Sequence, residues 1–336
     1  MKHSLLPWRA LGLQLICALL WWLPMGGAHA AVTCTATMTN VAFGNVNLVS
    51  SIGLATTATL SYRCTNHNGQ QTYAHVCFDA DAGAQGSGQL DPRQMTYKAS
   101  KLKFQLYQPP GDTTVLGSEF TATPTPYAID LTLAPAATTN GSVPIQGVIQ
   151  PGQSVPAGRY QDQFSGAHTA ITVNESTTAA PAGCSGTRAG TFRFSVTAQV
   201  MKACVVTAGA ASNIQIGPAS GVASSAVNTS GSNNIAISCT KNVPYYIGLA
   251  PSNGNTAGAG VMSGAGGNTD KVPYQLHSVS AAGPIWGNTA TSRTVGNGVQ
   301  GTGTGAAQSI PVFATAPSAN FTPDTYSDTV TVHVNY

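Results

Sequence analysis

The chain has 336 residues and a formal net charge of +3, and only 7% of its residues are charged. When Lys2 and Arg9 are set aside, 12 basic residues stand against 11 acidic ones, so the chain lacks the basic surplus typical of nucleic-acid binding. The one cluster of lysines, Lys98, Lys101 and Lys103, is interpreted as the solvated face of a strand.

Residues 1–30 have the three parts of an export signal. Lys2 and Arg9 give a basic start, an apolar run extends from Ala10 to Leu23, and Ala28-His29-Ala30 forms a small-x-small cleavage site. The apolar run is shorter than the roughly 20 residues of a membrane span. We therefore expect a soluble, exported chain that begins near Ala31.

Six cysteines remain once Cys17 leaves with the signal, and an even number in an exported chain predicts disulfides. Two pairs bracket the opening of two similar halves, and the remaining two cysteines pair by elimination. The expected disulfides are Cys34–Cys64, Cys204–Cys239 and Cys77–Cys184.

Short alternating segments separated by Gly, Pro and Asn indicate an all-β protein built from a repeated module. We assign the first copy to residues 31–200 and the second to residues 201–336. Four blocks match in the same order: 40–44 with 213–217, 58–65 with 234–240, 102–107 with 272–277, and 143–160 with 310–326. Strands with this spacing predict a sandwich in each half.

The two copies differ at their ends. The second ends in an alternating strand with one apolar face, formed by Val330, Val332, Val334 and Tyr336, and no sequence remains to cover it. The first is followed by a further alternating strand, whose apolar residues are Phe192, Phe194, Val196, Ala198 and Val200. We interpret this strand as completing the first copy, and the alternative is that it begins the second.

The ending from Pro323 to Tyr336 resembles the spore coat protein U-like domain of archaic chaperone-usher pilus subunits. The resemblance covers both halves, more strongly in the second than in the first. It implies two tandem immunoglobulin-like sandwiches, the C-terminal one lacking its last strand. In that family a periplasmic chaperone fills the gap temporarily, and the N-terminal strand of the next subunit then replaces it.

An ordinary subunit of that family carries a free donor strand before its first cysteine, but only Ala31, Val32 and Thr33 precede Cys34 here. The resemblance therefore implies a tip subunit at the cell surface, exported through the periplasm and handled by a chaperone and an outer-membrane usher. Its expected role is attachment to surfaces and biofilm formation through an unidentified surface or receptor. The alternative is a non-adhesive cap that starts fibre assembly.

Apolar residues in loops of the first copy are the candidates for surface contact: Val115, Leu116, Phe120, Val148 and Ile149. Strand alternation places loops near residues 65–73 and 165–190 at the pole far from the second copy. Desolvation of apolar loop residues favours adhesion to hydrophobic or abiotic surfaces. Burial of the same residues in the core of the first copy is the competing explanation.

Catalytic and metal chemistry is weakly indicated. Cys64-x-x-His67 and His75-x-Cys77 have spacings that suit zinc, but disulfides account better for the cysteines. Asp79 and Asp81 are interpreted as a solvated strand edge rather than an acid–base pair. No nucleophile elbow and no phosphate-binding loop is present, so we expect no enzyme and no cofactor.

Overall fold

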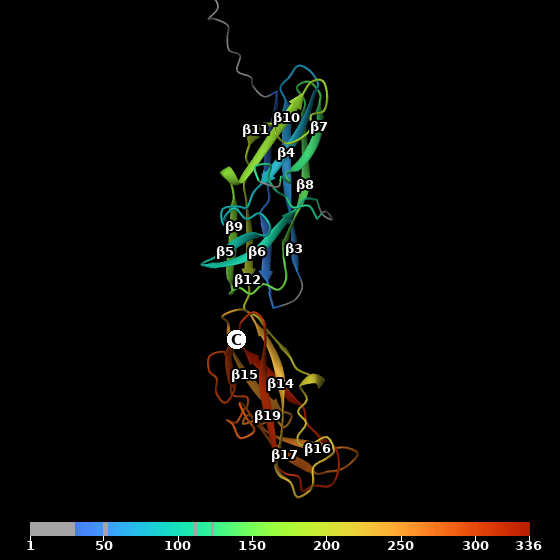
Figure 1. Ribbon diagram of the computed structural model, residues 1–336, viewed down its shortest axis with the longest axis vertical. Helices are drawn as coiled ribbons and strands as arrows, with labels where there is room; N and C mark the ends of the chain where they lie inside the picture. Colours follow the sequence, from blue (N-terminus) through green and yellow to red (C-terminus); the bar gives the residue numbers. More distant parts are fainter. Residues whose placement is uncertain (1–30, 50–52, 110–112, 122–123) are drawn as a thin grey trace, which may run out of the picture.

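The structure, a computed structural model, describes residues 31–49, 53–109, 113–121 and 124–336 (Figure 1). Strands β1–β12 form one pair of sheets and strands β13–β21 a second pair, and we name these the first and second domains. The domains are stacked end to end in Figure 1. The expected all-β fold with two sandwiches is confirmed.

In the first domain an eight-stranded sheet faces a four-stranded one. The order in the larger sheet is β1 (Val32–Met38), β3 (Leu54–Asn66), β8 (Thr138–Ile149), β6 (Ser100–Tyr107), β5 (Arg93–Tyr97), β9 (Gly158–Phe164), β12 (Phe194–Val200) and β2 (Val41–Val46). The order in the smaller sheet is β11 (Thr187–Gly190), β10 (Thr169–Ser176), β4 (Thr72–Ala80) and β7 (Tyr127–Leu133).

In the second domain a six-stranded sheet faces a three-stranded one. The order in the larger sheet is β13 (Cys204–Thr207), β14 (Val227–Cys239), β19 (Ala307–Ser318), β17 (Lys271–His277), β16 (Ala259–Gly264) and β20 (Tyr326–Ser327). The order in the smaller sheet is β18 (Val299–Thr302), β15 (Pro244–Pro251) and β21 (Val330–Asn335). Two single 3₁₀ turns, Gly166–His168 and Ala210–Ser212, complete the secondary structure of the described residues.

Each domain has its own apolar core, because alternate residues of its strands point inward. Phe78 and Phe104 are fully buried in the first core, and Trp286 in the second. The indole N–H of Trp286 donates to the carbonyl of Ile247 (2.9 Å), so the ring is buried without losing its hydrogen bond. Within the described part of the chain, no helix is long and apolar enough to cross a membrane.

The core of the first domain can be tested with two phenylalanines of opposite burial. Replacing the buried Phe104 with Ala should lower the free energy of unfolding by about 3–5 kcal/mol, through lost apolar burial and the cavity left behind. The matched control is Phe120→Ala, because 64% of the Phe120 side chain is exposed; it should change stability by less than about 0.5 kcal/mol. Urea unfolding of both variants measures the difference, and equal losses would contradict the assigned core.

Candidate strand-acceptor site

The second domain repeats the first strand by strand, with three strands missing. The larger sheets share the order β1-β3-β8-β6-β5-β9 and β13-β14-β19-β17-β16-β20, and the smaller ones β10-β4-β7 and β21-β15-β18. The strands without a counterpart are β2, β11 and β12. Strand β12 lies beside β9, β2 lies beyond β12, and β11 lies beside β10. These strands therefore cover an edge of the first domain that stays uncovered in the second.

In the first domain β12 lies between β9 and β2. It runs antiparallel to β9, with Phe194 opposite Phe164 and Val200 opposite Gly158, and parallel to β2. The rings of Phe194 and Phe164 stack 4.4 Å apart. Strand β11 continues the same cover along β10.

The side chains proposed to complete the first domain are all buried there. Their exposed fractions are 4% for Phe192, 4% for Phe194, 0% for Val196, 2% for Ala198 and 0% for Val200. Together they cover the apolar face of β9, where Tyr160 and Phe164 are fully buried.

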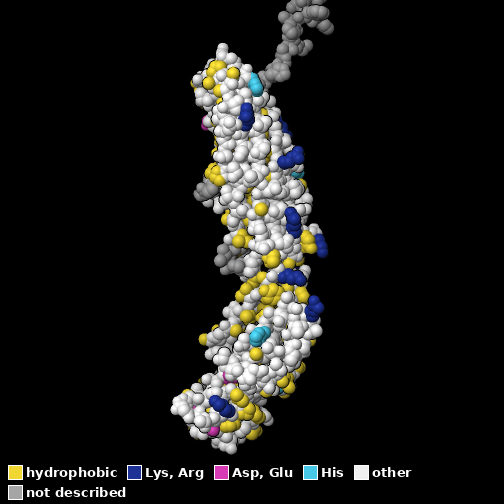
Figure 2. Space-filling model, turned by 180° about the vertical axis from the view of Figure 1, so that it is seen from behind, with side chains coloured by type: hydrophobic (Ala, Val, Ile, Leu, Met, Phe, Trp, Pro, Cys, Tyr) yellow, Lys and Arg dark blue, Asp and Glu magenta, His cyan; other side chains and the backbone are white. Residues whose placement is uncertain are grey.

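In the second domain the equivalent edge is uncovered. Strand β21 pairs with β15 on one side and β20 with β16, and no described strand pairs with their outer edges. Val330, Val332 and Val334 are only half-buried, and 48% of Tyr336 is exposed. We name this outer edge of β20 and β21 the acceptor groove; Figure 2 shows hydrophobic side chains gathered on the second domain beside its junction with the first.

The opposite wall of the groove differs from the sequence prediction. An alternating strand was expected at residues 213–217, by analogy with residues 40–44, but this segment forms no strand. In the first domain β2 is held by pairing with β12, and the second domain has no equivalent of β12. The segment is instead attached to β14, through Gly217 N–H to the Ser230 carbonyl and the Asn233 side chain to the Asn213 carbonyl. Ile214 and Ile216 remain half-buried beside the core.

A Tyr-x-Asp sequence that occurs in both domains differs in burial between them. Tyr160 and Asp162 of the first domain are fully buried, whereas their counterparts Tyr326 and Asp328 are half-exposed. Burial raises the pKa of the Asp162 carboxyl, although backbone N–H groups of Gln85 and Gln163 donate to it. A donor strand would bury Asp328 in the same way.

Asp328 already has a partner on the floor of the groove. The Tyr274 hydroxyl donates to its Oδ2 at 2.6 Å. Burial raises the pKa of Tyr274, and the bond to Asp328 raises it further. The buried end of the carboxylate is therefore satisfied before any strand covers it.

The three disulfides join the cysteines that the repeat pairs: Cys34–Cys64, Cys77–Cys184 and Cys204–Cys239. The first and third connect directly opposite residues of neighbouring strands. The second ties β4 to the loop that leads into β11, across 107 residues of sequence. It therefore fastens the beginning of the completing segment to the first domain.

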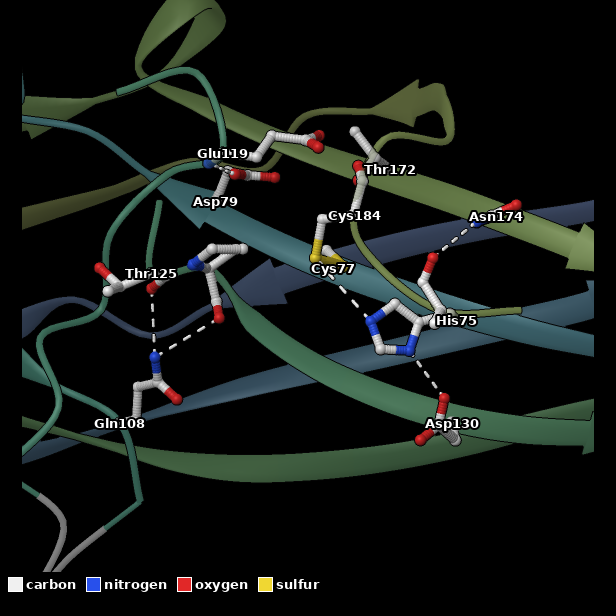
Figure 3. Close-up of a disulfide and its surroundings, with 12 residues drawn as sticks. His75, Cys77, Asp79, Gln108, Glu119, Thr125, Asp130, Thr172, Asn174 and Cys184 are labelled. Atoms are coloured by element: carbon white, nitrogen blue, oxygen red, sulfur yellow. Dashed lines mark hydrogen bonds and ion pairs between the residues drawn. A yellow bond between two sulfur atoms is a disulfide. The ribbon is translucent and has the colours of Figure 1, made fainter. Parts of the chain in front are cut away.

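His75 lies beside this disulfide (Figure 3). Its Nε2 is 3.9 Å from Cys184 Sγ, and its Nδ1 is 2.7 Å from Asp130 Oδ1. His75, Cys77 and Cys184 are the one group of described side chains placed to share a metal ion. Both sulfurs are bonded to each other, so neither offers a thiolate to zinc in this oxidised state. The other pair whose spacing suits zinc is also engaged, since Cys64 is in a disulfide and His67 bonds to Thr33.

Asp79 and Asp81 do not form the solvated edge that the alternation suggests. Asp79 is 1% exposed and accepts the backbone N–H of Glu119 at 2.6 Å (Figure 3). Its burial raises the pKa of the carboxyl to about 6, the Glu119 N–H lowers it, and the Glu119 charge raises it. Asp81 lies beyond the end of β4, where its carboxylate is 3.0 Å from His168 Nδ1.

The residues proposed for surface contact differ in how far they are buried. Leu116 and Ile149 are buried in the core, with exposed fractions of 0% and 1%, so neither can touch a surface. Leu116 is drawn in by its N–H bond to the Leu106 carbonyl, and Ile149 by its pairing with Leu54. Val115 and Val148 are half-buried, and Phe120 is the one residue of this set that is mostly exposed.

Three other loops meet at the pole farthest from the second domain. Ser176 of β10, Tyr73 of β4 and Thr132 of β7 lie side by side, so the chain leaves all three strands at one end. Two of these loops are rich in Ala and Pro, namely 134–137 and 179–182, and hydrophobic side chains are visible at this end in Figure 2. The loop between β3 and β4 and the loop that contains 179–182 fall within the ranges expected at this pole, whereas residues 165–168 lie at the other end of β10. Loop 134–137 was not predicted, because alanine and proline give no alternating signal.

Comparisons with known proteins identify the repeated module. The model of the Spore Coat Protein U domain matches residues 25–166 and again residues 190–333. The second match includes β12, although that strand pairs within the first domain. No curated protein matches the chain.

Solved structures give similar folds at low identity. The CsuC–CsuE chaperone–tip adhesion subunit complex of Acinetobacter baumannii Csu pili is 15% identical, covering 90% of this chain and 100% of that one, with a TM-score of 0.47. The CupB6 tip adhesin of Pseudomonas aeruginosa is 12% identical over 91% and 95% of the two chains, with a TM-score of 0.37. CfaE, the adhesive subunit of CFA/I fimbria of enterotoxigenic Escherichia coli, is 10% identical over 77% and 81%, with a TM-score of 0.28.

The buried carboxyl of Asp79 predicts a pH dependence of stability. Because the pKa of the Asp79 carboxyl in the folded state, about 6, exceeds the ordinary aspartate value of 3.8, its stabilising contribution is complete below pH 3.8 and is lost as the pH rises through 6. Asp79→Asn should therefore raise the Tm by about 2–4 °C at pH 7.5 and leave it nearly unchanged at pH 4. Thermal unfolding at both pH values measures this, and a lower Tm for Asp79→Asn at pH 7.5 would contradict the assignment.

Proposed function

Because the chain belongs to the Spore Coat Protein U domain family, with that domain in both halves, we propose that it is the tip subunit of a chaperone-usher pilus. In this proposal the second domain accepts the donor strand of the next subunit, and the first domain attaches to surfaces. The observation that carries the proposal is the bare outer edge of β20 and β21, where the first domain has β11 and β12. An exposed apolar edge of this kind favours strand addition.

The direction of β12 supports a linear fibre. It runs antiparallel to β9 and ends at Val200, opposite Gly158, where the chain passes into the second domain. A donor strand in the same orientation would start at the β21 end of the groove and finish beside Tyr326 of β20. In Figure 1 the C-terminus lies next to the junction and β16, the partner of β20, lies at the opposite end. The next subunit would therefore follow the second domain away from the first.

The pairing of β1 within the first domain supports a terminal position. Val32 and Thr33 are paired with Asn66 and Thr65 in the ladder between β1 and β3, so they are already used within the first domain. A segment held in this way cannot serve as a donor strand. We propose that a periplasmic chaperone and an outer-membrane usher handle the acceptor groove before the next subunit occupies it.

The apolar pole supports an adhesive role for the first domain. The loops 134–137 and 179–182 expose small apolar side chains at the same pole, where they extend from the strands β7 and β10 on either side of β4, far from the acceptor groove. Removing such side chains from water is favourable by roughly 25 cal/mol for each Å² buried. We propose that this pole contacts hydrophobic surfaces and promotes biofilm formation, and Phe120 is a second, separate contact.

The acceptor groove can be tested with a peptide taken from the chain itself. A peptide of residues 190–200 should bind the full-length protein and raise the Tm of the second domain by about 10 °C at 100-fold excess over its Kd. A control peptide with Ser at its five apolar positions should give no shift. Val332→Asp should abolish the shift, while His333→Asp, on the exposed face of β21, should preserve it. If His333→Asp reduced the peptide-induced rise in Tm as much as Val332→Asp does, a groove lined by the valines would be contradicted.

Adhesion can be tested at the pole without disturbing the groove. Ala136→Asp combined with Ala179→Asp should reduce binding of assembled pili to polystyrene at least several-fold, because each charge must be desolvated on contact. The matched control is Ala223→Asp in the second domain, which is equally exposed. Attachment is counted under flow at equal piliation. Unchanged attachment of the pole variant would favour the non-adhesive cap.

A further inference from the structure

Glu175, near the end of β10, holds the first two described residues of the chain. Its Oε1 accepts the backbone N–H of Ala31 at 2.8 Å, and its Oε2 accepts the N–H of Val32 at 2.6 Å. Both oxygens of one carboxylate therefore point at consecutive main-chain nitrogens. Glu175 lies in the smaller sheet, and Ala31 immediately precedes strand β1 of the larger one, so the contact joins the two sheets at the distal pole.

No described side chain neutralises this carboxylate. The ion pairs among the described residues are His75–Asp130 and His168–Asp81, and Glu175 has no part in either. A half-buried carboxylate that accepts hydrogen bonds from two neutral amides is stabilised less than one that also contacts a positive charge. The nitrogen that it grips first belongs to the residue at which the export signal is expected to end.

We propose that Glu175 is the binding site for the α-ammonium group that signal cleavage creates at Ala31. Hydrolysis by a signal peptidase breaks the bond between the Ala30 carbonyl carbon and the Ala31 nitrogen. The hydroxyl of water goes to the Ala30 carboxyl group, and the Ala31 nitrogen takes the proton and one more from solvent. The neutral amide at Oε1 thereby becomes a cation, and the contact becomes a charge-assisted hydrogen bond.

The surrounding hydrogen bonds fix the position of this nitrogen. The Ala31 carbonyl accepts the N–H of His67, and Val32 is fully buried opposite Asn66. A chain that began one residue earlier or later would place its ammonium about 3.5 Å away along the strand. The site therefore fits an ammonium group at Ala31 better than one a residue earlier or later.

The clasp also has a consequence at the pole. Glu175 is followed by Ser176, the last residue of β10, and then by the loop 177–186 that carries one of the two Ala/Pro segments. Removal of the signal would fasten the strand from which that loop departs. The inference concerns the first domain alone and does not require that the pole be adhesive.

The test is a double-mutant cycle on the exported full-length protein. Intact mass should show a chain starting at Ala31. Glu175→Gln should lower the Tm by about 2–4 °C, and so should one Gly inserted between Ala30 and Ala31, verified by mass to start at that Gly. The insertion in the Glu175→Gln background should add little, because both changes remove the same ion pair. Additive losses, an insertion without effect in the wild type, or a mature chain starting elsewhere would each overturn the proposal.

A chemical variant keeps the test decisive if the insertion impairs export. Transamination of the mature N-terminus replaces the α-ammonium with a ketone and leaves the sequence unchanged. It should lower the Tm of the wild type by a similar amount and leave that of Glu175→Gln unchanged. Equal losses in both proteins would show that the charge at Ala31 does not act through Glu175.

Discussion

The structure depends on one constraint, which is that the edge strands β20 and β21, one in each sheet of the second domain, have main-chain groups and apolar side chains that this domain does not cover. An isolated sheet edge exposes unpaired N–H and C=O groups, and half-buried valines leave core surface in contact with water. Val330, Val332 and Val334 show this directly, since each is partly open to solvent, whereas Ile171 and Val173 on the equivalent strand β10 are buried. The function follows from where that missing cover is supplied.

The same chain contains both the open and the closed form of one sandwich. In the first domain the cover comes from residues 187–200, which lie between the two modules in sequence and continue directly into the second domain. The Cys77–Cys184 disulfide fastens the beginning of that segment to β4, so the completing strands cannot leave easily. The connection between the two domains therefore has the same geometry that we propose for the connection between the second domain and its neighbour in a fibre.

The alternation of apolar residues and the internal repeat predicted much of this arrangement. Alternation located the strands at Phe192–Val200 and Val330–Tyr336, and the repeat assigned the three disulfide pairs. Neither pattern could show the effect of a missing partner strand. Residues 213–217 alternate like residues 40–44 but form no strand, because alternation reports side-chain burial and not the presence of a neighbouring strand to pair with. Leu116, Ile149 and Asp79 were misplaced for a related reason, since loop residues and carboxylates enter a core through tertiary contacts that leave no local pattern. The role of Glu175 depends on a contact across 144 residues and had no signal at all.

Amide hydrogen exchange on the full-length protein, read residue by residue, tests the central claim most directly. The account predicts that amides of β9 and β12 exchange slowly, whereas amides on the outer edge of β20 and β21 exchange fast until a donor peptide is added, and then slowly. Slow exchange along β20 and β21 in the absence of any donor would contradict it, because the edge would then already be covered.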